Sequence, residues 1–234
     1  MEYRDPFIEI LIEGSSSVFR GLSPSDKEYL DSHHSHTVYK KGDFIIKEGE
    51  KSRGFMILVS GKAKLFRVGA GNREQIIKML RPQSVIIYRT LFKDNPYHFS
   101  SKALEDSAVV TLEKPSLLKI LKTNPEMAVR FMKIMADELT CTYNRLISLT
   151  QKHVRGRLAE SILLLRDTYG LEADGRTLRI MLSREDIAHL SSMTTANAIR
   201  TLSSFVSENI IEIERRKIVI INALKLEEIS ESGQ

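Results

Sequence analysis

One long helical pattern constrains the fold of this chain more than any other feature. Residues 125–150 contain few helix breakers, and about 26 helical residues extend roughly 39 Å. Apolar or small side chains recur there at alternating spacings of four and three: Ala128, Met132, Met135, Leu139, Thr142, Leu146 and Leu149. This is the spacing of a coiled-coil seam, although a helix packed on its own core can show it too. We favour a homodimer seam, because Phe131 and Ile134 provide a second apolar face for the rest of the chain.

The region before this helix has the sequence pattern of a small antiparallel barrel, sandwich or roll. Short apolar runs alternate with glycine turns at ~8–12-residue spacing. We expect strands at residues 44–46, 55–59, 64–68, 75–80 and 109–112. A helix capped by Ser23 precedes them and ends near His33, His34 and His36. We expect these histidines to form a solvated turn rather than to bind a haem.

The region after the long helix is different again. Residues 154–169 form a helical pattern that Gly170 stops, and residues 178–182 read as a short strand after the Asp174-Gly175 turn. The acidic segment 224–234 is expected to be frayed.

Residues 183–206 have the pattern of two short helices separated by a turn. Ser183 can cap the first helix with Asp186 as its reciprocal partner. Residues 191–193 form the turn, and Thr194 can cap the second helix. We expect that second helix to bury Ile199, Leu202 and Val206. This spacing is that of a helix-turn-helix, whose second helix presents its N-terminal side chains to the DNA major groove.

A hairpin pattern follows, with strands at residues 210–213 and 218–221. The segment between them contains Arg215, Arg216 and Lys217, which can bind phosphates as the tip of a wing. Arg200 can contact a guanine in the groove through two hydrogen bonds. The groove candidates are Thr194, Thr195, Asn197, Arg200 and Thr201. For the threonines, a cap or the helix surface is an equal alternative.

From about residue 19 to residue 221 the chain resembles the Crp/Fnr superfamily of bacterial transcription regulators. The resemblance rests on FRGLS at 19–23, KGD at 41–43, EGE at 48–50, ILVSGK at 57–62, KHVRGRLA at 152–159 and LSREDIA at 182–188.

This resemblance implies an α+β chain with three parts. They are a jelly-roll-like β-roll effector domain of the cyclic-nucleotide-binding type at 1–124, a dimerisation helix at 125–150 and a winged helix-turn-helix domain at 151–234. The resemblance also implies allosteric control of double-stranded DNA binding by a homodimer at a two-fold-related operator. Contact with RNA polymerase, as in an activator, is implied as well.

The chain departs from the family pattern at its ligand positions. Cyclic-nucleotide binders of the family carry Gly-Glu for the ribose, and then Arg-Ser or Arg-Thr for the phosphate. Here the matching positions hold Ile87-Tyr88 and the segment 97–101. The sequence therefore argues against cyclic AMP binding, because polar ligand atoms would be left unpaired. The single cysteine, Cys141, also excludes an iron–sulfur cluster of the family's oxygen sensors.

The recognition helix departs from the family pattern too. Thr195-Ala196 replace the family's common Arg-Glu, whereas Arg200 fits the arginine that follows it. We therefore expect an operator that differs from the usual one.

The charge distribution raises the question of an effector. The chain's net charge of +5 lies wholly in residues 1–150, and residues 40–102 hold 14 Lys+Arg against 5 Asp+Glu. An anionic small molecule near Tyr88, Arg89, Phe99, Ser100 and Ser101 is one interpretation. Charges solvated on the roll's outer faces, in a ligand-independent regulator, are the favoured one.

Other functions find no support in the sequence. We find no nucleophile–base pair, no metal-ligand spacing and no phosphate-binding glycine loop, so neither an enzyme nor a resident cofactor is expected. His189 is expected to be a surface or core residue. With neither a secretion signal nor an apolar run of about 18 residues, a cytoplasmic protein without a membrane segment is expected.

Overall fold

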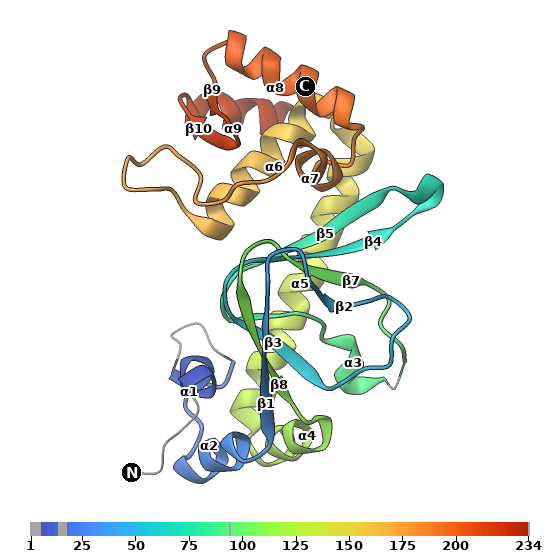
Figure 1. Ribbon diagram of the computed structural model, residues 1–234, viewed down its shortest axis with the longest axis vertical. Coiled ribbons are helices and arrows are strands. Elements are labelled where there is room, and N and C mark those ends of the chain that lie inside the picture. The colour runs from blue at the N-terminus through green and yellow to red at the C-terminus, as the bar shows by residue number, and fades with distance from the viewer. Residues whose placement is uncertain (1–5, 14–17, 94, 234) are drawn as a thin grey trace. The chain divides into compact units, whose positions relative to one another are not determined.

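A computed structural model describes residues 6–13, 18–93 and 95–233 (Figure 1). The described residues divide into two compact units, one within Met1–Arg67 and Lys78–Thr140, the other within Val68–Ile77 and Cys141–Gln234. The sequence-based boundaries, at 124/125 and 150/151, differ from this division. Among the described helices, none is both long enough and apolar enough to cross a membrane.

The strands of the N-terminal half form a roll of two four-stranded antiparallel sheets, with strand orders β1-β8-β3-β6 and β2-β7-β4-β5 (Figure 1). The roll belongs to the first unit except for Val68–Ile77, which includes the start of β5. The strands are β1 His34–Tyr39, β2 Phe44–Ile46, β3 Phe55–Ser60, β4 Ala63–Val68, β5 Glu74–Leu80, β6 Ser84–Val85, β7 Ser100–Ala103 and β8 Ser107–Leu112. All five expected strands are confirmed, whereas β1, β6 and β7 were missed.

Strand β1 corrects the expected turn at the histidine run. Helix α2 (Pro24–Asp31), capped by Ser23 as expected, ends before the run, and His34 already pairs with Leu112 of β8. Only Tyr39 is buried along β1. The first four residues of the strand are polar, so it lacks the apolar alternation by which strands are recognised in a sequence.

Helices cover one side of the roll and complete its core. They are α1 Pro6–Glu13, α2, α3 Arg89–Phe92, α4 Lys114–Thr123 and the start of α5, Pro125–Gln151. Met127 and Phe131 of α5 are buried with Phe55 and Val110 of the roll. The long helix and its second apolar face are thus confirmed.

The second unit contains five helices and one hairpin in its described part. They are the short 3-10 helix Ala70–Asn72, α6 Val154–Tyr169, α7 Arg184–Leu190, α8 Thr195–Ser207, α9 Ala223–Ser232 and the hairpin β9 Ile211–Glu214 with β10 Lys217–Ile220. The end of α5 also belongs to this unit.

Two expectations for the secondary structure of this unit were wrong. Residues 178–182 form no strand, because only isolated bridges at Thr177 and Leu178 occur there. Their apolar alternation instead reflects burial of Leu178, Ile180 and Leu182 in the core. Residues 224–232 are not frayed either: α9 is capped by Asn222 and buries Leu226 and Ile229.

Candidate nucleic-acid interface

Helix α7 begins at a reciprocal cap, as the sequence predicts. The Ser183 hydroxyl accepts a hydrogen bond from the backbone N–H of Asp186 at 2.9 Å and donates one to the Asp186 carboxylate at 2.8 Å. Ile187, Ala188 and Leu190 are buried on its inner face. The cap therefore sets the start of the helix, and the buried face sets its rotation.

The turn between α7 and α8 is held by an arginine of α6. Ser192 adopts a left-handed backbone conformation with φ 54°, and Met193 turns back into the core. The guanidinium of Arg157 donates hydrogen bonds to the carbonyl oxygens of Ser191 and Ser192, at 3.2 and 3.4 Å. These bonds fix the angle at which α8 leaves the turn.

Helix α8 presents a different face to the core from the one expected. Thr194 caps the helix by accepting a hydrogen bond from the Asn197 backbone N–H at 3.2 Å. Ala198, Leu202 and Phe205 form the buried face. Ile199 and Val206, which the sequence placed in the core, are exposed, Ile199 by 47%. The buried face is therefore centred nearer Ala198 than the sequence predicts, while Leu202 is buried as expected.

The outer face of α8 carries the polar groups that sequence reasoning singled out. Thr195 and Arg200 are exposed, while Asn197 and Thr201 are half-buried. The Arg200 guanidinium donates a hydrogen bond to the Asn197 side-chain oxygen, so the two side chains lie together. Ile199 and Ser203 are exposed on this face as well. Ile199 was not predicted there, because an apolar residue at helical spacing is normally assigned to the core.

Two further interactions anchor the C-terminal end of α8. Arg155 of α6 donates hydrogen bonds to the Ser204 hydroxyl and the Glu208 carboxylate, both at 2.8 Å. Its guanidinium also lies 4.8 Å from the centroid of the Phe205 ring. The hydrogen bond from Arg155 lowers the pKa of Glu208. The recognition helix is thus held at both ends.

The hairpin beside α8 has a shorter tip than expected. Strands β9 and β10 pair with Glu214 opposite Lys217, which leaves only Arg215 and Arg216 in the turn. Arg215 adopts φ 59°, and all three basic side chains are exposed. Lys217 therefore belongs to a strand, yet the basic cluster remains open to a phosphate backbone.

The residues of the expected dimer seam leave much apolar surface uncovered. Met132 is 60% exposed and Leu139 51%. The other exposed seam residues are Met135, Thr142, Leu146 and Leu149, and Ala128 is half-buried. Adjacent Val129, Tyr143 and Ile147 are exposed as well. An uncovered apolar stripe of this kind marks an interaction surface.

The candidate effector residues do not all line the same pocket. Arg89 and Phe99 line a small open pocket together with Ile87, Thr90, Lys93, Asn95, Pro96 and His98. Tyr88 instead packs edge-on against Phe131, and burial raises the pKa of its hydroxyl. The Ser100 hydroxyl accepts a hydrogen bond from the Glu48 backbone N–H at 3.0 Å, and Ser101 is fully buried. Only two of the five predicted residues therefore face this pocket.

Three features define the class of protein as a two-domain transcription regulator. They are the β-roll, the long helix with its uncovered apolar stripe and the winged helix-turn-helix. Comparisons with known proteins give the family. Residues 36–124 match the cyclic nucleotide-binding domain, and residues 156–229 match the Crp-like helix-turn-helix domain. The chain belongs to the Crp/Fnr family of transcription regulators.

Its relatives are distant but match nearly from end to end. The chain is 24% identical over 213 residues to a CRP-like cAMP-activated global transcriptional regulator of Mycobacterium tuberculosis, covering 90% of this chain and 95% of the relative. It is also 24% identical to the cyclic AMP receptor protein of Thermus thermophilus, covering 92% and 97%. The solved structure of FixK2 from Bradyrhizobium japonicum has the same fold, with a TM-score of 0.74, 22% identity and coverage of 84% and 96%.

Proposed function

We propose that this protein binds a two-fold-related DNA operator as a homodimer and regulates transcription under control of its β-roll. The observation that carries the proposal is the exposed face of α8, where Arg200 lies beside Asn197 and the basic hairpin follows. The N-terminal part of such a helix enters the major groove, and the hairpin contacts the backbone. We further propose contact with RNA polymerase and a cytoplasmic location, as in other members of the family.

Selection from random DNA duplexes, followed by fluorescence anisotropy on the selected site, tests DNA binding. We expect Arg200→Ala to weaken binding about 5- to 150-fold, because a two-bond contact to guanine contributes about 1–3 kcal/mol. Lys122→Ala is the control, since it removes one exposed positive charge from α4. Equal binding by the wild type and Arg200→Ala would exclude Arg200 from base recognition.

The selected sequence tests a second point. Thr195 and Ala196 offer methyl groups, which suit thymine, where the family pattern has Arg-Glu. We therefore expect a half-site different from the usual family site. Recovery of the usual half-site would contradict this.

The exposed stripe of α5 supports the homodimer. Burying one leucine side chain stabilises an interface by roughly 1.5–3 kcal/mol, and a symmetric dimer buries two copies. Leu139→Lys should thus weaken the dimer by about two to four orders of magnitude in sedimentation equilibrium. Thr140→Lys adds the same side chain at the exposed neighbouring position and should leave the dimer intact. Equal dimerisation of the two variants would contradict a seam through Leu139.

We propose that cyclic AMP is not the effector, although one relative is described as cAMP-activated. Ile87 and Tyr88 supply no carboxylate for a ribose, and residues 97–101 supply no guanidinium for a phosphate. The second candidate function, sensing of an anionic small molecule, is supported by Arg89 and Lys93 at the pocket. Thermal-shift screening of anionic metabolites distinguishes a small-molecule sensor from a ligand-independent regulator. A rise in melting temperature that Arg89→Ala abolishes supports a sensor, and no change in melting temperature supports a ligand-independent regulator.

A further inference from the structure

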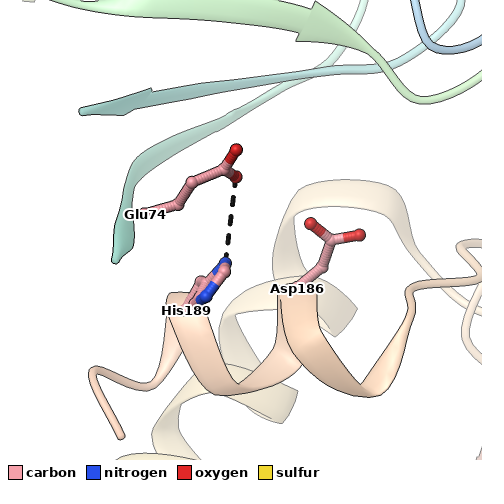
Figure 2. Close-up of side chains that lie close together, drawn as sticks. All are labelled: Glu74, Asp186 and His189. Carbon is pink, nitrogen blue, oxygen red and sulfur yellow. Dashed lines mark ion pairs between the residues drawn. The ribbon is translucent and has the colours of Figure 1, made fainter. Parts of the chain in front are cut away.

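A carboxylate of the second unit lies close to two polar residues of α7 (Figure 2). Glu74, Asp186 and His189 each offer one metal-ligand atom, and these atoms all lie within 4.8 Å of one another. The His189 Nδ1 atom is 3.8 Å from a carboxylate oxygen of Glu74. The three side chains are partly shielded from solvent.

The backbone places these side chains independently of any contact among them. Asp186 and His189 are three residues apart on α7, so they share one face of the helix. Glu74 begins β5, in the segment Val68–Ile77 that belongs to the same compact unit. The Gln75 side-chain amide donates a hydrogen bond to the carbonyl oxygen of His189 at 2.8 Å. Glu74 is thereby held opposite α7.

An arginine of α5 supports the same placement of Glu74 opposite α7. Arg145 of α5 donates one hydrogen bond to the Leu190 carbonyl oxygen at 2.7 Å and another to that of Ile77 at 3.4 Å. It therefore bridges the end of α7 and the strand that carries Glu74. Burial lowers the pKa of Arg145, because desolvation disfavours the charged guanidinium.

The imidazole of His189 is incompletely satisfied. The side chain is only 14% exposed, and its Nδ1 atom is buried without a hydrogen-bond partner among the described residues. The 3.8 Å separation from Glu74 is too long for a hydrogen bond. Because buried polar atoms almost always have a partner, this nitrogen calls for one that the described residues do not supply.

We propose that Glu74, Asp186 and His189 bind a divalent first-row transition-metal ion. Two carboxylate oxygens and one imidazole nitrogen suit an ion of the zinc type, with water completing the coordination. In a tetrahedral site with bonds of about 2.0–2.2 Å the ligand atoms lie about 3.3–3.6 Å apart. Atoms separated by the full 4.8 Å must therefore approach each other by roughly 1.2–1.5 Å. The two carboxylates also balance the charge of the ion.

Such an ion would tie the segment Val68–Ile77 to the first helix of the helix-turn-helix. It would add three bonds to a common centre where Glu74 and His189 form a weak ion pair. Metal supply would then change the stiffness of α7. This inference does not rest on DNA binding, so its test and that of the proposed function fail separately.

The experiment uses the full chain without an affinity tag, freed of metal by chelation. Zn²⁺ is titrated by calorimetry, and Co²⁺ is followed by its visible absorption. We expect one site per chain, with an affinity at least 10-fold lower in Glu74→Gln and in His189→Ala. His153→Ala is the control, because His153 is an exposed histidine of the same unit whose side chain makes no capping bond.

The metal affinities of the variants decide whether Glu74 and His189 bind the ion. A site lost in both ligand variants and retained in His153→Ala supports the proposal. Binding of equal affinity in the wild type and both ligand variants, or no binding by the wild type at 100-fold molar excess of Zn²⁺, would overturn it. If His189→Ala fails to fold, Glu74→Gln alone decides, since Glu74 is partly exposed at the start of a strand.

Discussion

Replacing Gly156 by alanine tests how the end of the chain docks on α6. A Cβ atom at Gly156 would lie 2.8 Å from the Cα and carbonyl carbon of Gly233 and 2.9 Å from its oxygen. Carbon atoms in contact are normally about 3.5–4.0 Å apart, so the overlap approaches 1 Å against backbone. The Gly233 carbonyl also accepts a hydrogen bond from the His153 N–H at 2.8 Å, which limits its freedom to move.

The expected magnitude follows from two opposing terms. Alanine in place of glycine inside a helix stabilises by about 1 kcal/mol. Overpacking against a fixed backbone costs about 1–3 kcal/mol. Gly156→Ala should therefore lower the unfolding free energy of this unit by up to about 2 kcal/mol. In a chain that ends at Ser232 the clash is absent, and the same substitution should stabilise by about 1 kcal/mol.

Urea unfolding followed by far-ultraviolet circular dichroism measures both effects, since the chain has no tryptophan. The four chains form a double-mutant cycle whose coupling should be about 1–3 kcal/mol. Gly170→Ala is the control: Gly170 has φ +75° and open space around it, so its cost should not depend on the truncation. Equal stabilisation by Gly156→Ala in the full and truncated chains would refute the close approach of Gly233 to Gly156.

Two further predictions concern the register of α8 and the Asp174 turn. In urea titrations Leu202→Ala should lower the unfolding free energy by about 2–5 kcal/mol, whereas Ile199→Ala should change it by at most about 0.5 kcal/mol. Ile199→Ala should instead weaken DNA binding. An equal loss of stability in both variants would show that Ile199 is buried, as the sequence predicts. Asp174 accepts hydrogen bonds from the Thr177 hydroxyl, the Thr177 N–H and the Arg176 N–H, which lower its pKa from 3.8 to about 2. Its stabilising contribution is therefore complete above about pH 4 and is lost as the pH falls through 2. The stability difference between the wild type and Asp174→Asn should shrink over that range in thermal melts, and a constant difference would show that ionised Asp174 is not involved.

Much of the architecture followed from short-range patterns. The long helix, its stripe, the five glycine-bounded strands and the capped helices after Ser183 and Thr194 all depend on residues within one or two turns of one another. Local hydrogen bonds and side-chain periodicity are encoded at that range, so the sequence was sufficient for them. The sequence also showed that Ile87 and Tyr88 depart from the family's ligand-binding pattern, because that comparison needs only the identity of the residues.

The errors came from features that depend on distant partners. Strand β1 exists because it pairs with β8, and its own residues give little sign of a strand. Helix α9 is ordered because α6 offers it a surface that Gly156 leaves open. The burial of Ala198 and Phe205 in place of Ile199 and Val206 depends on how α8 packs on the core, which the apolar pattern of the helix alone did not reveal.

The sequence by itself determined the order of roll, long helix and winged helix-turn-helix, and with it the family resemblance. Only the tertiary structure decided which side chains meet. It exposed Ile199, separated Tyr88 from the pocket that Arg89 lines, and brought Glu74 to His189. The physical reason is that a periodic pattern fixes which face of an element is apolar, whereas the neighbours of a side chain depend on packing between segments far apart in the chain.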